Sequence, residues 1–109
     1  MALFNNARWE FTFKIQNEAG VAQDLTGRSF VMSINDELRT NPPDLVLSTT
    51  AGSLIIGETT GDLQVFATYG LVRELKQGNY YFDIIEVLGE DQVMVASGEL
   101  YVKSGVTWT

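Results

Sequence analysis

The chain has 109 residues, of which 45% are hydrophobic and 19% charged, and 14 acidic side chains against 7 basic ones give a net charge of −7. This length fits one domain, and the apolar fraction is typical of a folded protein and too high for a disordered one. The sequence contains neither cysteine nor histidine. Disulfides, thiolate nucleophiles and cysteine-based metal centres are therefore excluded, and so is the usual general base near neutral pH.

Basic and apolar residues are spread along the chain rather than gathered in runs. No two of the seven basic residues are adjacent, so the sequence offers no basic stripe for a nucleic-acid backbone. It has no apolar segment long enough to span a membrane as a helix, and its first residues lack the basic and apolar regions of a signal peptide. We expect a single acidic domain, residues 1–109, with neither nucleic acid nor a membrane as its partner.

Alternation of apolar and polar residues predicts the first strands. Over residues 8–15, Trp9, Phe11, Phe13 and Ile15 alternate with charged or polar side chains. This period of two is typical of a half-buried antiparallel strand. Similar patterns and the turn residues between them indicate further strands at 28–34, 44–49, 53–56 and 62–67.

One helical window follows, at residues 68–76. Leu71, Val72 and Leu75 recur at spacings of three and four, and Thr68 stands where an N-cap is expected. A helix of about two turns is not stable alone, so we expect it to pack on a sheet.

An aromatic strand is predicted at residues 79–88. Tyr80, Phe82 and Ile84 share one face, but Glu86 falls on the same apolar face. A β-bulge near this position, or burial of the strand on both faces, would accommodate the glutamate.

The last predicted strand covers residues 92–103. We expect Gly98 to leave room for a large neighbour, such as an aromatic ring, to press against the backbone. Its predicted inner face consists of Met94, Ala96, Gly98, Leu100 and Val102. Seven or eight short strands and one short helix indicate an all-β fold, an antiparallel β-sandwich.

Acidic residues are the first candidates for chemistry, because they are abundant. Asp83 and Glu86 lie three apart on a strand and start on opposite faces, which is poor geometry for an acid–base pair. Glu90 and Asp91 belong to a hairpin turn, where solvated acids are ordinary. Asp83 stands inside an aromatic strand, and we expect it to bond to a neighbouring backbone group or to an arginine.

Other catalytic or metal sites find little support. The oxygen ligands Asn35, Asp36, Glu37 and Asp44 do not have the spacing of a helical calcium-binding loop. Ser97 lacks a base to activate it, and the glycines do not follow a phosphate-binding pattern. The sequence predicts no catalytic residue, no cofactor and no metal ligand, and hence no enzyme.

Aromatic side chains at the strand period are most simply core residues. These are Trp9, Phe11, Phe13, Phe30, Tyr80 and Phe82. Trp108 differs, because it is one residue from the C-terminus. Two interpretations stay open for it: the ring folds back on the sandwich, or it inserts into a partner.

A set of short motifs extends along nearly the whole chain: Glu10-Phe11-Thr12-Phe13, Asn17-Glu18-Ala19-Gly20, Asp24-Leu25-Thr26-Gly27, Gly61-Asp62, Gly78-Asn79-Tyr80-Tyr81-Phe82-Asp83, Gly98-Glu99-Leu100-Tyr101-Val102 and Gly105-Val106-Thr107. These motifs resemble a small domain of tailed bacteriophages and prophages. The layout is similar to the N-terminal β-sandwich of baseplate upper proteins, which anchor receptor-binding proteins. The resemblance implies an immunoglobulin-like sandwich in a virion. The sequence departs from the family pattern at Ile85-Glu86.

The resemblance implies a non-enzymatic phage structural protein, made in the bacterial host cytoplasm and placed in the tail tip, the baseplate or the fibre-attachment region. It would act as an assembly scaffold, contact other virion proteins and form a homo-oligomer. We predict that Tyr101, Val106 and Trp108 bind the partner. The alternatives are a head-decoration or accessory virion protein, a carbohydrate-binding module, and an acidic inhibitor that mimics nucleic acid.

Overall fold

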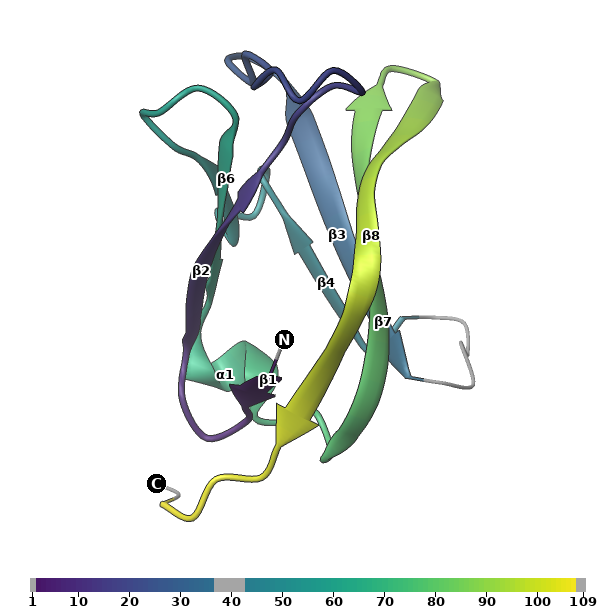
Figure 1. Ribbon diagram of the computed structural model, residues 1–109. Coiled ribbons are helices and arrows are strands. Elements are labelled where there is room, and N and C mark those ends of the chain that lie inside the picture. Colours follow the sequence, from purple (N-terminus) through teal and green to yellow (C-terminus); the bar gives the residue numbers. More distant parts are fainter. Residues whose placement is uncertain (1, 37–42, 108–109) are drawn as a thin grey trace.

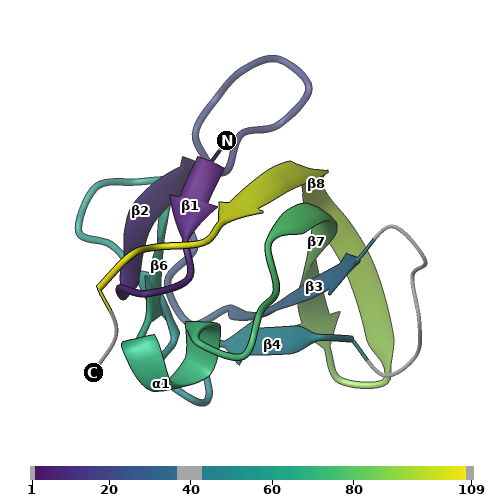
Figure 2. The same cartoon turned by 90° about the horizontal axis from the view of Figure 1, so that it is seen from below.

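A computed structural model describes residues 2–36 and 43–107, which form two β-sheets that face each other across one core (Figures 1 and 2). The all-β fold expected from the sequence is confirmed. Within these ranges the elements, in chain order, are β1 (Ala2–Phe4), β2 (Trp9–Lys14), β3 (Ser29–Asp36), β4 (Leu45–Ser48), β5 (Leu54–Ile56), β6 (Asp62–Ala67), α1 (Tyr69–Val72), β7 (Gly78–Leu88) and β8 (Asp91–Lys103).

The strands divide unequally between the two sheets. One sheet has the order β1-β8-β7-β3-β4, and the other has the order β2-β6-β5. All neighbouring strands are antiparallel except β1 and β8, which run parallel. The prediction of a wholly antiparallel sandwich is therefore wrong at this edge, because it omitted the short strand β1, which has no periodic pattern of its own.

The helix is shorter than the predicted 68–76. It covers only Tyr69–Val72, and Thr68 precedes it without a side-chain capping hydrogen bond. The chain then tightens, because the Leu75 N–H donates to the Val72 carbonyl, three residues back. The Leu75 carbonyl accepts a hydrogen bond from the buried side chain of Asn5 at 2.8 Å. These competing bonds end the helix after one turn, although Val72 and Leu75 are buried as expected.

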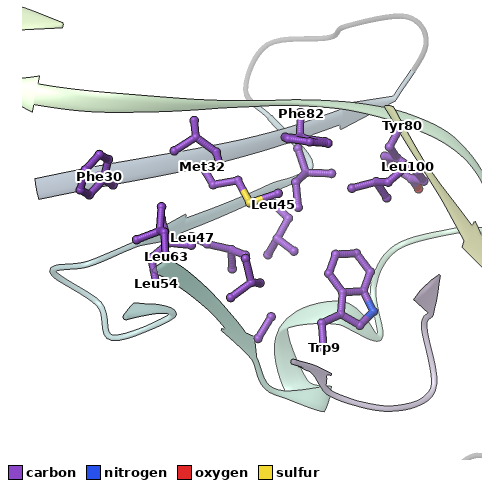
Figure 3. Close-up of a cluster of buried hydrophobic side chains, with 14 of the residues drawn as sticks. Trp9, Phe30, Met32, Leu45, Leu47, Leu54, Leu63, Tyr80, Phe82 and Leu100 are labelled. Atoms are coloured by element: carbon purple, nitrogen blue, oxygen red, sulfur yellow. The ribbon is translucent and has the colours of Figure 1, made fainter. Parts of the chain in front are cut away.

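Side chains from both sheets meet in the core (Figure 3). Phe82 on β7 stands directly opposite Gly98 on β8, and a Cβ added to Gly98 would lie 3.0 Å from the Phe82 ring. The ring of Phe82 also contacts the ring of Phe13 on β2, with the ring centres 5.3 Å apart. The expected role of Gly98 is confirmed: it gives space to an aromatic ring that spans the two sheets.

The glutamate keeps its place on the apolar face of β7, and the expected bulge lies in the neighbouring strand β8. Glu86 does lie on the inner face of β7 and is 6% exposed. A bulge lies opposite, in β8, where Ile84 pairs with Ala96 but Ile85 pairs with Met94. Val95 is the extra residue, and beyond it the alternation of β8 is shifted.

The bulge corrects one predicted core position. Ala96, Gly98, Leu100 and Val102 face inward as expected, but Met94 is 61% exposed and lies on the outer side of the sheet. Val95 packs against the core in its place.

Replacing Leu100 with alanine should lower the free energy of unfolding by about 2–5 kcal/mol, because the side chain is buried opposite Tyr80 and its removal leaves a cavity. Denaturant unfolding measures the loss. Leu88→Ala is the matched control, because Leu88 is exposed, and it should change stability by less than about 0.5 kcal/mol. Equal losses for the two variants would contradict the inward position of Leu100.

Candidate functional site

The three residues predicted to bind a partner differ in their surroundings. Tyr101 is half-buried on β8, and its hydroxyl accepts a hydrogen bond from the side chain of Gln77 at 2.9 Å. Val106 is 95% exposed. Trp108 lies outside the described residues, so the two interpretations of its ring stay open.

The segment after β8 is tied to the N-terminal turn. The Gly105 N–H donates to Oδ1 of Asn5 at 3.2 Å, and the side chain of Asn6 donates to the Thr107 carbonyl at 2.9 Å. A side chain at position 105 would collide with Asn6. Residues 104–107 therefore follow the body of the domain, near α1 and β1 (Figure 1), and Val106 is the exposed large hydrophobic residue among them.

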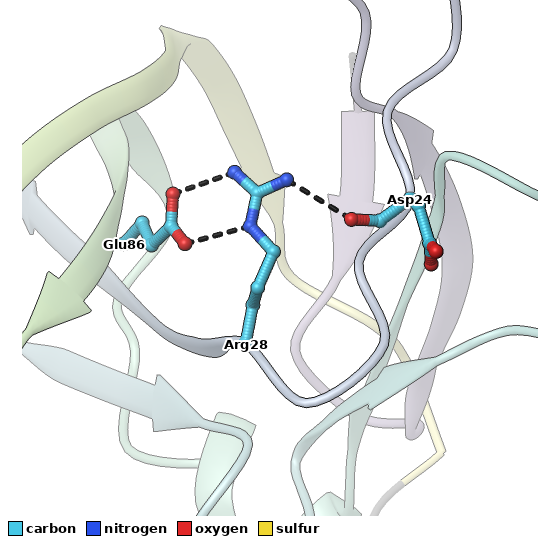
Figure 4. A network of polar contacts seen from close by, with 3 residues as sticks. All are labelled: Asp24, Arg28 and Glu86. Atoms are coloured by element: carbon cyan, nitrogen blue, oxygen red, sulfur yellow. Dashed lines mark hydrogen bonds and ion pairs between the residues drawn. The ribbon is translucent and has the colours of Figure 1, made fainter.

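The most buried charges form a closed ion pair (Figure 4). The Arg28 guanidinium donates from Nε and Nη2 to the two oxygens of Glu86, each at 2.6 Å, and from Nη1 to the Asp24 carbonyl at 3.1 Å. These hydrogen bonds from Arg28 hold the pKa of Glu86 below its ordinary value, although burial opposes them. Each of the three guanidinium nitrogens of Arg28 donates a hydrogen bond within the domain. The ion pair therefore acts as a structural clamp.

The oxygen ligands considered for calcium do not assemble into a site. The Asp44 carboxylate accepts the backbone N–H of Asp36 at 2.9 Å, and Glu37 lies outside the described residues. In the ranges 2–36 and 43–107, no three acidic side chains cluster closely enough to hold a metal ion.

The outer face of the five-stranded sheet has a hollow of about 540 Å³ over β3, β7 and β8. Strand register places Ser33, Asp83 and Ser97 in one row across these three strands. The next row consists of Asn35, Tyr81 and Glu99, and Met94 lies at the other side of the hollow.

Asp83 in this hollow does not have the expected partner. Its Oδ1 atom is buried, and among the described residues it accepts no hydrogen bond. The expected bond from Asp83 to a backbone group or to an arginine is not found among the described residues, and Arg39 lies outside them. Arg28 bonds to Glu86, because Arg28 lies on the inner side with Glu86, whereas Asp83 faces outward. The expectation that these two acids point to opposite faces is confirmed.

A second feature is the open edge of β8. β1 covers this strand only at Tyr101, Val102 and Lys103. Among the described strands, residues 91–100 pair with β7 alone. Residues 92–98 carry no charge, and Val93 and Met94 are exposed. An uncovered, uncharged strand edge is able to accept another strand.

Sequence comparison with known protein families and with curated proteins gives no significant match. In the described parts of the chain, no helix is long and apolar enough to cross a membrane.

Sequence reasoning located neither the hollow nor the open edge. The alternation of β7 did place Asp83 on the outer face of the strand, away from the core, and this is the one signal in the sequence that points to the hollow. The row of Ser33, Asp83 and Ser97 depends on the register of three strands, and the open edge depends on how far β1 extends.

Arg28→Met should destabilise the domain more than Glu86→Gln does. The first variant leaves a carboxylate that is only 8% exposed, whereas the second leaves a guanidinium that is 28% exposed and can reach water. We expect Arg28→Met to cost about 1–3 kcal/mol in denaturant unfolding. A larger loss for Glu86→Gln would show that the buried carboxylate does not need its partner.

The ion pair between Arg28 and Glu86 also predicts that the stability of the domain depends on pH. Because the pKa of Glu86 is lowered on folding, its contribution to stability is present above its ordinary pKa of 4.5 and is lost as the pH falls through the folded value. The stability difference between the wild type and Glu86→Gln should therefore shrink below pH 4.5. Thermal unfolding across that pH range measures it, and a constant difference would contradict the lowered pKa.

Proposed function

We propose that this chain is a non-enzymatic structural protein of a tailed-phage virion, in the tail tip, the baseplate or the fibre-attachment region. It acts as an assembly scaffold that joins copies of itself or neighbouring virion proteins. The virion context is supported by the phage-like motifs, and the scaffold role is supported by the surface. The observation that carries the scaffold role is the open edge of β8 over residues 91–100.

The sandwich in this proposal is immunoglobulin-like. Lettered in chain order, the described sheets read A-G-F-C-C′ and B-E-D, which resembles immunoglobulin variable-type sheets with strand A at the G edge and without strand C″. The Tyr80 hydroxyl, near the start of β7, donates to the Lys76 carbonyl four residues upstream at 2.8 Å. A tyrosine bonded in this way at the start of strand F is a hallmark of such domains.

The inter-sheet contact supports the same assignment. Phe82 stands two residues after Tyr80, where antibody domains carry the second cysteine of their inter-sheet disulfide. Its ring meets that of Phe13 on β2, the strand equivalent to the other half of that bond. An aromatic pair thus joins the two sheets at the position of the disulfide.

The β8 edge suits a protein partner because its backbone groups are available along an uncharged stretch. Two copies that pair through residues 92–98 bring no acidic side chains directly opposite each other within that stretch. This matters because each copy carries a net charge of −7, which otherwise opposes association. Main-chain hydrogen bonds supply the affinity in this kind of strand addition, and side chains supply the specificity.

Val93→Lys should weaken self-association by about tenfold or more, because a charge on an edge strand opposes pairing and a two-fold contact contains the substitution twice. Sedimentation velocity over a concentration series measures the change. Val46→Lys is the matched control, because Val46 is similarly exposed on β4, at the opposite edge of the same sheet. A chain that ends at Lys103 tests the contribution of Val106 and Trp108.

Two outcomes contradict the proposed contact at the β8 edge. If the wild type stays monomeric and no virion protein binds it, or if Val46→Lys weakens association as much as Val93→Lys, the β8 edge is not the contact. Mass spectrometry of purified virions tests the context. The protein should be present in intact particles in amounts comparable with known tail components, and its absence from them would overturn the virion assignment.

A further inference from the structure

We propose that the hollow over β3, β7 and β8 is a binding site for an arginine side chain of a partner protein, with Asp83 as its anchor. The site lies on the outer face of the five-stranded sheet and shares β8 with the proposed scaffold contact, which uses the edge of that strand. The row of Ser33, Asp83 and Ser97 forms its floor, and Met94 and Glu99 lie at its sides.

The unpartnered carboxylate oxygen is the first reason. A carboxylate oxygen that is removed from water without accepting a hydrogen bond destabilises the folded chain, and such atoms are rare in native proteins. Oδ1 of Asp83 is in this state among the described residues. Two other acids on the strands do have cations: Glu86 pairs with Arg28, and Asp62 pairs with Lys14. Asp83 has no such cation among the described residues, and in this proposal a partner protein supplies the donor.

The charge of the hollow selects a cation. Asp83 and Glu99 both line it, and its described lining contains no lysine or arginine. The net charge of −7 on the whole chain adds to the negative potential there. A positively charged donor is therefore attracted, and an anionic ligand is repelled.

The arrangement of acceptors favours arginine over lysine. Neighbouring strands lie about 4.8 Å apart, so the hydroxyls of Ser33 and Ser97 flank the Asp83 carboxylate at one strand spacing on each side. A planar guanidinium donates in several directions within one plane and can bond to the carboxylate and to a flanking hydroxyl together. A lysine ammonium is a compact point charge and does not match such a row.

The side of the hollow provides a surface for the apolar stem. The bulge at Val95 turns Met94 outward, where it is 61% exposed and lines the hollow. A flexible thioether adapts to the methylene chain of an arginine, whose stem packs on apolar surface while its head remains polar.

A sugar fits these observations less well. Carbohydrate sites stack sugar rings on exposed aromatic faces, but Tyr81 in this hollow is half-buried and most other aromatic rings on the strands belong to the core. Sugar hydroxyls also supply no positive charge to offset Asp83 and Glu99. Sugar binding is therefore an outcome that would overturn the proposal.

The test is a titration of the ¹⁵N-labelled full chain with acetyl-arginine-methylamide, followed by two-dimensional NMR. We expect saturable shifts at the residues that line the hollow, and an affinity about tenfold or more lower for Asp83→Asn. Glu90→Gln is the matched control, because Glu90 is an exposed acid at the β7–β8 turn, and it should bind like the wild type. Acetyl-citrulline-methylamide, a neutral probe of nearly the same shape, should give no saturable shifts in the hollow.

A second measurement keeps the result interpretable. Because Asp83→Asn removes an unpaired charge, the melting temperature of the free protein should rise by roughly 2–6 °C. A fall would show that Asp83 has a structural partner and would overturn the proposal. So would equal binding by Asp83→Asn, equal binding of the citrulline probe, or saturable shifts in the hollow with N-acetylglucosamine alone. Probe binding tests the outer face of the sheet, whereas Val93→Lys tests strand pairing at the β8 edge, so the two proposals can fail separately.

Discussion

The Phe82 ring fixes how the two sheets pack against each other. It contacts Gly98 on one side and the ring of Phe13 on the other. The ring needs Gly98, because any side chain there would meet it at 3.0 Å. Phe82 belongs to the strand that pairs with both β3 and β8, so its position ties the central sheet to β2 in the opposite layer. The outer face of β7, including Asp83, is held in place by the same packing.

Much of this architecture follows from periodicity alone. Alternation identified β2, β3 and β7, and it placed Glu86 on the inner face even though a buried glutamate looked improbable. Arg28 resolves the conflict, because a bidentate partner makes the inward carboxylate tolerable. Periodicity failed for β1, which is only three residues long, and for α1, because the hydrogen bond from Asn5 to the Leu75 carbonyl comes from the other end of the chain.

The surface was harder to predict than the core, for a physical reason. Burial leaves a pattern in the sequence, whereas the meeting of Ser33, Asp83 and Ser97 requires a particular register between strands that are far apart in the chain. Sequence reasoning did single out Asp83 and expected it to bond to a neighbouring backbone group or to an arginine. Arg28 stands on the other side of the sheet, so facing direction, rather than the kind of residue, decided which acid is paired.

The bulge at Val95 has a consequence for how the β8 edge can be used. On its two sides the side chains of β8 follow opposite phases, so an incoming strand cannot keep one alternation along the whole edge. A strand with regular alternation, such as one from a misfolded chain, matches the β8 edge on only one side of Val95. A strand with a matching irregularity, or one that stops at Val95, fits without strain. Val95 thus disfavours non-specific pairing at the β8 edge, and it fixes the register of a specific partner strand.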